Sequence, residues 1–342
     1  MLNSSRQNSN PIKDIVLIIG GAGYLGSTLV DLLLSKDYFV RVLDKLLYEN
    51  IFSMASFLEN PNFEFIKGDF CIKEELLPAL KGVNHVVHLA ALVGDPICKK
   101  YPELAQKINL NGAKELIKTI SDFSPKRFIF TSTCSNYGLR QENEPAGEDS
   151  ELNPKSLYAE TKVAFEEFLL GQKKVLPFSP TILRLSTAFG ISRRMRFDLT
   201  VSEFARDLAC GKELLVYDEN TWRPYCHIRD ISNAIYKILT SPREKISGEV
   251  FNVGSDRGNH TKKMLVEIIC KKIPGSKVQY KKGGMDPRNY RVSFAKIEKQ
   301  LGFSCQHMVP YAIEKIIQAV GLGLFKDVDA DKNRYGNYEI SE

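Results

Sequence analysis

Tyr158 and Lys162 have the residue types and the spacing of a proton-transfer pair. They lie four residues apart in Leu157 to Leu170, a stretch with a helical pattern, so they share one face of the predicted helix. A lysine ammonium beside a phenol favours the phenolate and lowers the pKa of the tyrosine. Such a tyrosine can take or return the proton of a hydroxyl group. An amphipathic helix that only exposes a tyrosine and a lysine is the alternative interpretation.

Three glycines predict a second site near the N-terminus. Gly20, Gly23 and Gly26 follow the apolar run Ile15 to Ile19 and open the predicted helix Tyr24 to Leu34. A GxxGxxG turn between a strand and a helix lets the backbone approach a pyrophosphate, and the helix N-terminus offers free N–H groups. The sequence therefore predicts a dinucleotide-binding turn, with a tight turn that only needs glycine as the alternative.

Two carboxylates follow the next predicted strands. Asp44 ends the strand Phe39 to Leu43, where a carboxylate can accept both ribose hydroxyls of NAD and repel the 2′-phosphate of NADP. Lys45 comes next and can soften that discrimination. Asp69 follows the strand Phe63 to Ile66 and can accept a hydrogen bond from the adenine amino group. Asp is common in turns, so a turn role is the alternative for both residues.

These residues depend on strands that alternate with helices. Short apolar runs predict strands at 15–19, 39–43, 63–66, 85–89, 127–130 and 181–185, and helical patterns lie between most of them, notably at 104–121 and 157–170. This alternation predicts an α/β fold with a Rossmann-type, doubly wound parallel sheet. Thr133 then lies just beyond the fifth strand, at the carboxyl edge where such sheets bind ligands.

The second half of the chain has a looser pattern. Only two short strands are predicted there, at 214–217 and 249–253, among short helices. We therefore expect an NAD-binding domain over residues 1–185, to which 226–253 returns, and a smaller C-terminal substrate-binding lobe over 186–322. Residues 323–342 are polar and are expected to form a tail.

Composition and charge argue against several classes of protein. No apolar run approaches the roughly 20 residues that span a bilayer, so no membrane contact is expected. The net charge of +6 is spread along the chain, which suits an anionic small substrate and not a nucleic acid. Seven cysteines without a CxxC pair predict neither a metal site nor a disulfide framework. Free thiols and a polar N-terminus fit a cytoplasmic protein.

Several short motifs occur in one order between residues 15 and 303. They are Ile19–Gly26, His88–Ala91, Asn109–Gly112, Thr131–Gly138, Tyr158–Lys162, Arg184–Leu185 and Arg223–Tyr225 leading to Asp230. Each alone is weak, but the series resembles the extended short-chain dehydrogenase/reductase family, which includes NAD-dependent nucleotide-sugar epimerases and dehydratases. One departure is Ile19, where the family usually has Thr or Ser. With Ile19 the chain lacks the hydrogen bond that a hydroxyl would make there, but the glycine turn that approaches the pyrophosphate is unchanged.

The resemblance implies roles for individual residues. Tyr158 is the proton carrier, and a nearby nicotinamide cation favours its phenolate together with Lys162. Lys162 also holds the nicotinamide ribose, and Thr133 holds the reacting hydroxyl. Thr131 or Ser132 becomes that residue if the alignment slips by one step. The implied cofactor is NAD, and its implied contacts are Gly20, Gly23, Tyr24, Leu25, Gly26, Asp44, Asp69, Phe70, Leu89, Ala90, Ala91, Asn109, Tyr158 and Lys162.

The substrate side carries arginines. Arg223 resembles the family residue that contacts the substrate diphosphate, and Arg288 matches a second phosphate contact. A guanidinium forks two hydrogen bonds to phosphate, so arginine suits this role. Arg194, in the basic loop Ile191 to Asp198, is a further candidate, with a solvated charged loop as the alternative. Thr187 stands where many family epimerases have an Asn near the sugar, which leaves the sugar open.

The residues after Thr133 argue against one reaction of the family. Well-known 4,6-dehydratases carry an Asp-Glu pair there, because eliminating water needs an acid and a base at neighbouring carbons. This chain has Cys134 and Ser135 instead. Serine is no base and cysteine is at best a poor acid, so we expect Cys134 to be a small buried residue.

The leading hypothesis is redox-neutral 4-epimerisation of a nucleoside-diphosphate sugar through a 4-keto intermediate. The alternatives are a nucleotide-sugar dehydrogenase or 4-keto reductase, an atypical dehydratase, and, in another class, a non-catalytic NAD-binding regulator. The intact Thr133, Tyr158 and Lys162 set argues against the regulator. Family members commonly pair through the helices that here span 104–121 and 157–170, so a homodimer is expected. The apolar residues that either face a partner or face the sheet are Leu116, Ile117, Ile120, Phe165, Phe168 and Leu169.

Overall fold

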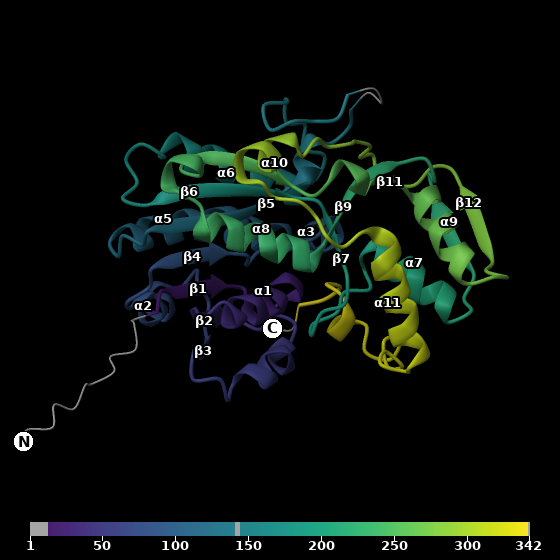
Figure 1. Cartoon of the computed structure of the whole chain (residues 1–342), viewed down its shortest axis with the longest axis horizontal. Helices are drawn as coiled ribbons and strands as arrows, with labels where there is room; N and C mark the ends of the chain where they lie inside the picture. Colours follow the sequence, from purple (N-terminus) through teal and green to yellow (C-terminus); the bar gives the residue numbers. More distant parts are fainter. Residues whose placement is uncertain (1–12, 141–143, 341–342) are drawn as a thin grey trace, which may run out of the picture.

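A parallel sheet of seven strands forms the first unit of the protein (Figure 1). The computed structural model describes residues 13–140 and 144–340, so most of the polar N-terminal segment lies outside the described residues. The strand order is β10 (Glu249–Val253), β6 (Ser179–Leu185), β5 (Arg127–Thr133), β4 (His85–His88), β1 (Ile15–Ile19), β2 (Phe39–Asp44) and β3 (Phe63–Lys67). The expected Rossmann-type sheet is confirmed, and its order reverses between β1 and β4, where such folds bind ligands.

Helices cover both faces of this sheet, which explains why its strands are apolar runs rather than alternating ones. Val16 and Ile18 of β1 belong to the core under α1 (Tyr24–Ser35) and α8 (Ile228–Thr240). Leu17 and Ile19 point the other way. The helices of that second face are α2 (Lys73–Leu80), α5 (Ala113–Ser121) and α6 (Leu157–Gly171).

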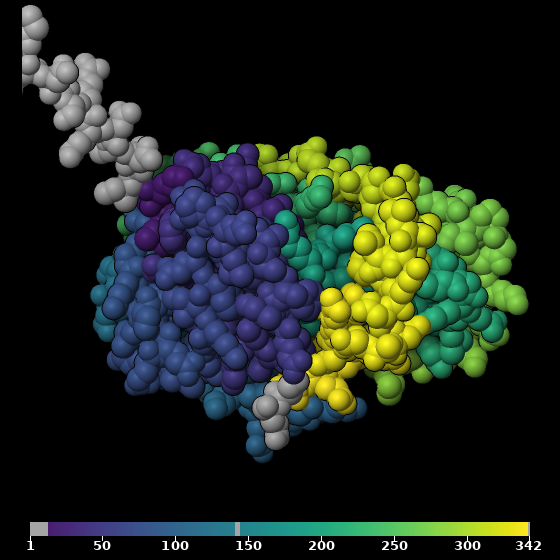
Figure 2. Space-filling view, turned by 90° about the horizontal axis from the view of Figure 1, so that it is seen from below, coloured from purple at the N-terminus to yellow at the C-terminus, as the bar shows by residue number. Residues whose placement is uncertain are grey.

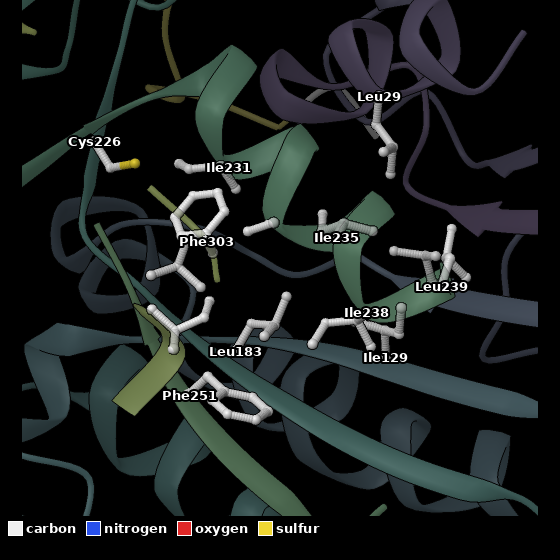
Figure 3. Close-up of a cluster of buried hydrophobic side chains, with 14 of the residues drawn as sticks. Leu29, Ile129, Leu183, Cys226, Ile231, Ile235, Ile238, Leu239, Phe251 and Phe303 are labelled. Atoms are coloured by element: carbon white, nitrogen blue, oxygen red, sulfur yellow. The ribbon is translucent and has the colours of Figure 1, made fainter. Parts of the chain in front are cut away.

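The packing of α8 shows how the second half of the chain stabilises this sheet (Figure 3). Its Ile231, Ile235 and Ile238 are fully buried and face strand residues that include Leu183 and Phe251. Phe303, which follows α10 (Ala295–Leu301), joins the same core. This face of the sheet is therefore covered by residues from both halves of the chain.

The helix expected over 104–121 is divided into three parts. It consists of α4 (Pro102–Gln106), the π-helical turn η2 (Lys107–Gly112) and α5. Five of the six apolar residues considered for a dimer face, all except Phe168, are at most 1% exposed and lie in the core of one chain. The sheet-facing alternative therefore holds for these five, and they carry no argument for a homodimer.

A smaller unit is formed by elements after β6, and α8 and β10, which lie between them in the sequence, return to the large sheet. The helices α7 (Thr200–Ala209), α9 (Lys262–Lys272) and α11 (Val309–Gly321) share one core with the strands β8 (Leu214–Tyr217) and β12 (Val278–Lys281). A second small sheet contains β7 (Thr187–Phe189), β9 (Trp222–His227) and β11 (Asn259–Thr261). The short helices are α3 (Asp95–Lys100), η1 (Asn50–Phe57), η3 (Cys134–Tyr137), η4 (Arg243–Lys245), η5 (Asp256–Gly258) and η6 (Asn333–Tyr335).

The segment after α11 runs back to the first unit, and Figure 2 shows it in yellow beside the blue N-terminal part. Its Tyr335 carbonyl accepts a hydrogen bond from Phe197 N (2.8 Å), and its Asn337 side chain donates to the Val93 carbonyl (3.0 Å). The described part of this tail is therefore attached to both units. No helix within the described ranges is both long and apolar enough to cross a membrane.

Candidate active site

One cavity of about 560 Å³ lies at the carboxyl edge of the sheet, between the two units. Its wall includes the glycine turn after β1, the ends of β2, β4, β5 and β6, and residues of the smaller unit. Most of the predicted site residues meet there. The ones that line the cavity are Gly20, Gly23, Tyr24, Leu25, Gly26, Asp44, Asp69, Phe70, Leu89, Ala90, Ala91, Thr133, Tyr158, Lys162, Thr187, Arg194, Arg223 and Arg288.

The glycine turn has no space for a side chain at Gly20 or at Gly26. Gly20 has φ +88°, and a Cβ there would lie 2.7 Å from the backbone nitrogen of Ala90. A Cβ on Gly26 would lie 2.5 Å from the Gly21 carbonyl oxygen. No side chain caps the start of α1, so the N–H groups of its first turn stay available to an anion. The turn is built as a phosphate cradle.

Asp44 and Asp69 are held by backbone N–H groups. The Asp44 carboxylate accepts from Ala22 N (2.9 Å) and Leu46 N (2.8 Å), although burial raises its pKa. Asp69 accepts from Cys71 N (2.9 Å) and pairs with Lys45 (3.0 Å). Burial opposes these bonds, yet they hold the pKa of Asp69 below its ordinary value. Lys45 turns to Asp69, and the positive charge that acts on Asp44 is that of Arg194, which opposes the effect of burial on the pKa of Asp44.

Asn109 is the one predicted cofactor residue that does not line the cavity. It lies in the π-helical turn η2 and is 3% exposed. Its side chain accepts from Leu92 N (2.7 Å) and donates to the Leu92 carbonyl (3.1 Å). Asn109 therefore fixes the loop after β4, which carries Leu89 and Ala91 into the cavity wall.

Thr133, Tyr158 and Lys162 come together from β5 and the first turns of α6. Ser156 caps this helix by accepting from Ala159 N (3.4 Å). Lys162 Nζ donates to the carbonyl of Thr131 (2.8 Å) and lies 5.9 Å from the centre of the Tyr158 ring. The set can hold a substrate hydroxyl between a threonine hydroxyl and a phenol.

In the protein without its cofactor the pKa of Tyr158 is raised. The expected lowering also relies on a nicotinamide cation, so it stays a prediction for the protein with bound cofactor. Burial raises the pKa of the Tyr158 phenol, and burial also lowers the pKa of Lys162 to about 8. Removing both groups from water disfavours the phenolate and the ammonium alike. Without cofactor, Tyr158 is therefore a neutral phenol, and Lys162 beside it loses its proton more easily than an exposed lysine does.

A buried network behind Thr133 was missed by the sequence analysis. Arg184 donates to both oxygens of Glu166, at 2.7 Å from Nη2 and 3.0 Å from Nε to Oε2 and 3.3 Å from Nε to Oε1. Asn136 donates to Glu166 (2.8 Å) and to Ser132 Oγ (3.1 Å). This network fixes the turn η3 that follows Thr133. One available indication was that Glu166 lies four residues after Lys162, on the same helix face.

Cys134 is buried, as expected, and is 1% exposed. Its thiol donates to the Arg184 carbonyl (3.3 Å), and burial raises its pKa. Ser135 faces the cavity and accepts a hydrogen bond from Arg288 (3.0 Å). Neither residue offers an acid–base group at this position.

The two arginines of the substrate side meet at one carboxylate. Arg223 donates to Asp286 (2.9 Å), and Arg288 binds both oxygens of the same group (2.8 and 2.9 Å). Burial opposes it, but the bonds from Arg288 and the charge of Arg223 hold the pKa of Asp286 well below its usual range. Arg288 also pairs with Asp95 (2.9 Å). An anionic substrate that binds these arginines would therefore have to displace the carboxylates of Asp286 and Asp95 from them.

A profile of the NAD-dependent epimerase/dehydratase family matches residues 16–254 of this chain. The chain belongs to that family. A UDP-glucose 4-epimerase of Lactobacillus helveticus is 26% identical over 314 residues, which cover 85% of this chain and 92% of the relative. The human sterol-4-alpha-carboxylate 3-dehydrogenase, decarboxylating, is 33% identical over 156 residues, which cover 45% of this chain and 39% of that enzyme.

Solved structures agree with the sequence comparison. The UDP-glucose 4-epimerase of Thermus thermophilus, in complex with NAD, superposes with a TM-score of 0.77 at 25% identity, over 89% of this chain and 98% of that one. The cofactor of the family is NAD, and the geometry fits it. The glycine turn would hold the pyrophosphate, Asp44 a ribose, and Lys162 and Tyr158 the nicotinamide end.

The position of Asp44 leads to a prediction about cofactor choice. We expect this family member to bind NAD at least about tenfold more tightly than NADP, because the Asp44 charge repels a 2′-phosphate. Asp44→Asn keeps the shape of the side chain and removes its charge, so it should reduce the difference between the affinities for NAD and NADP. Calorimetric titration of both cofactors measures it. Equal or tighter binding of NADP by the unmodified protein would contradict the role of Asp44.

Proposed function

We propose that this family member catalyses redox-neutral 4-epimerisation of a nucleoside-diphosphate sugar. The observation that carries the proposal is the meeting of Thr133, Tyr158 and Lys162 with the glycine turn in one cavity. NAD held by the glycine turn would supply reversible hydride transfer at C4 of the sugar. Tyr158, as the phenolate that Lys162 and the positive charge of oxidised NAD would favour, takes the proton of the C4 hydroxyl and gives it back, while Thr133 holds that hydroxyl in place.

Two features favour epimerisation over the other reactions of the family. Cys134 and Ser135 occupy the positions of a dehydratase acid–base pair and offer neither group. The cationic groups of the substrate side, Arg223, Arg288 and Lys262, line the cavity and suit a diphosphate that stays bound while the sugar turns. Redox-neutral turnover requires such an anchor, because the keto sugar must not leave between its two hydride transfers.

A net dehydrogenase or 4-keto reductase is the second candidate. Its specific support is the human sterol dehydrogenase, whose matching part covers 45% of this chain. The same tyrosine and lysine serve hydride transfer in either direction. An atypical dehydratase has less support. Asp95 is a carboxylate in the cavity wall, but it accepts from Ser156 (2.6 Å) and pairs with Arg288.

One experiment separates an epimerase from a net dehydrogenase or reductase. Purified protein with one nucleotide sugar and no added cofactor should reach an equilibrium mixture of two sugars, without steady growth of NADH absorbance. Retained NAD is regenerated in each cycle, so no external oxidant is consumed. Stoichiometric NADH formation, or a product that requires added NAD(P)H, would replace the proposal with a dehydrogenase or reductase.

We also propose that the protein is a cytoplasmic homodimer that pairs through α5 and α6. The support is the half-buried Phe168, over which Lys114 Nζ lies at 5.3 Å, together with Val163 and Ala164 on the same helix. Light scattering at micromolar concentration should give twice the mass of one chain, and Phe168→Asp should reduce it to one. A monomer mass for the unmodified protein would refute the dimer.

A further inference from the structure

Two arginines of the loop before α7 are buried in the cavity wall. Arg194 is 2% exposed and Arg196 is 7% exposed, and both line the cavity with Tyr48. Arg196 is neutralised by Asp198, which accepts hydrogen bonds from both Nε (2.9 Å) and Nη2. Arg196 therefore has its counter-ion within the loop. The counter-ion of Arg194 has still to be identified.

Arg194 has no such partner, since none of the ion pairs among the described residues includes it. Its Nη2 donates to the Gly336 carbonyl (2.9 Å), and its guanidinium lies 4.8 Å from the centre of the Tyr48 ring. Its Nε is buried without a hydrogen-bond partner in the described part of the chain. A buried cation without a direct ion pair is costly. Burial and the neighbouring charge of Arg196 lower the pKa of Arg194 to about 10. The more distant carboxylates of Asp198 and Asp44 offset this lowering only in part. The site therefore calls for an anion.

The loop that carries Arg194 is attached to the start of α1. Ser192 Oγ donates to the Tyr24 carbonyl (2.7 Å) and lies 3.0 Å from Ser27 Oγ. Tyr24 in turn donates its hydroxyl to the Gly190 carbonyl (2.6 Å). Ser192 Oγ also accepts from Arg194 N (3.3 Å). Arg194 is thus held beside the helix N-terminus that faces a dinucleotide pyrophosphate.

We propose that Arg194 binds the pyrophosphate of the cofactor together with the glycine turn, and that the C-terminal tail positions it. The sequence analysis assigned Arg194 to the substrate, but Arg223 and Arg288 already serve that side of the cavity. The tail is anchored on both units, through Asn337 Nδ2 to Val93 O (3.0 Å) and Asn337 N to Asp198 (3.3 Å). Its Gly336 carbonyl then orients the guanidinium. This inference rests on the NAD cofactor of the family and not on the proposed 4-epimerisation.

The test compares ligands with and without the adenosine diphosphate group on cofactor-stripped protein. Arg194→Gln should bind NAD and ADP-ribose about 10- to 100-fold more weakly, because a charge-assisted contact with phosphate is lost. UDP binding should not change. The matched control is Arg193→Gln, since Arg193 points away, pairs with Asp31 (3.1 Å) and lies over Phe57. Its affinity for ADP-ribose should stay within about twofold of the unmodified protein.

Three results would overturn the proposal. If Arg194→Gln binds UDP more weakly and ADP-ribose unchanged, Arg194 contacts the substrate and not the cofactor. Unchanged binding of both ligands would leave Arg194 without a ligand role. Adenosine has no phosphate and should bind both proteins equally, so an equal loss for adenosine and ADP-ribose would show an effect on the fold alone. Should Arg194→Gln not fold, Arg194→Met takes its place, because it removes the charge and keeps part of the apolar stem. An ADP-ribose affinity of Arg194→Met equal to that of the unmodified protein contradicts the proposal.

Discussion

Replacing Tyr158 with phenylalanine is expected to reduce turnover by about 10²- to 10⁴-fold while NAD binding persists. The substitution removes only the phenolic oxygen, and the ring keeps its packing beside Leu92, Ile97 and Cys98. The glycine turn and Asp44 are untouched, so the cofactor keeps its main contacts. The reacting hydroxyl, however, loses the group that takes its proton.

The measurement is the initial rate with a nucleotide sugar, combined with the NAD content of the purified protein. Tyr236→Phe is the matched control, because Tyr236 lies on α8 in edge contact with Tyr38 and does not line the cavity. It should turn over like the unmodified enzyme. Near-normal turnover of Tyr158→Phe with full NAD content would exclude Tyr158 as the proton carrier.

The order of strands and the cavity edge were predictable because they follow local rules. Ile15 to Ile19, the glycines and Asp44 are close in the sequence, and a strand, a tight turn and a helix can form there without distant contacts. Tyr158 and Lys162 are likewise related by helix geometry alone. These residues lie in the cavity wall where the sequence placed them.

Contacts between distant segments were not predictable in this way. Arg194 donates to the Gly336 carbonyl, 142 positions away in the sequence, and Arg288 pairs with Asp95, which is also distant in the sequence. No local sequence pattern predicts either contact. The raised pKa of Tyr158 in the protein without its cofactor was not predictable for a related reason. Four-residue spacing to Lys162 indicates a neighbouring charge, but the depth of burial that raises the pKa depends on the whole fold.

Replacing Glu166 with leucine is expected to lower the free energy of unfolding by about 3–5 kcal/mol. Glu166 and Arg184 have side chains only 2% and 5% exposed, so the substitution leaves a guanidinium buried without its carboxylate. Asn136 loses its hydrogen bond to Glu166 at the same time, so the turn after Thr133 is held less firmly.

An exposed ion pair serves as the control, because its loss costs much less stability. Glu115→Leu, whose carboxylate pairs with Lys118 at 64% exposure, should cost less than about 1 kcal/mol.

The double variant Glu166→Leu with Arg184→Met distinguishes a lost charge partner from lost packing. If the penalty comes from an unpaired buried charge, removing both charges should restore part of the stability that Glu166→Leu loses, because the remaining side chains need no ion pair. Urea denaturation of the two single variants and the double variant measures this coupling. A double variant less stable than either single one would show that packing and the bonds of Arg184 to Tyr137 and Glu148, not the ion pair, stabilise the turn that carries Thr133.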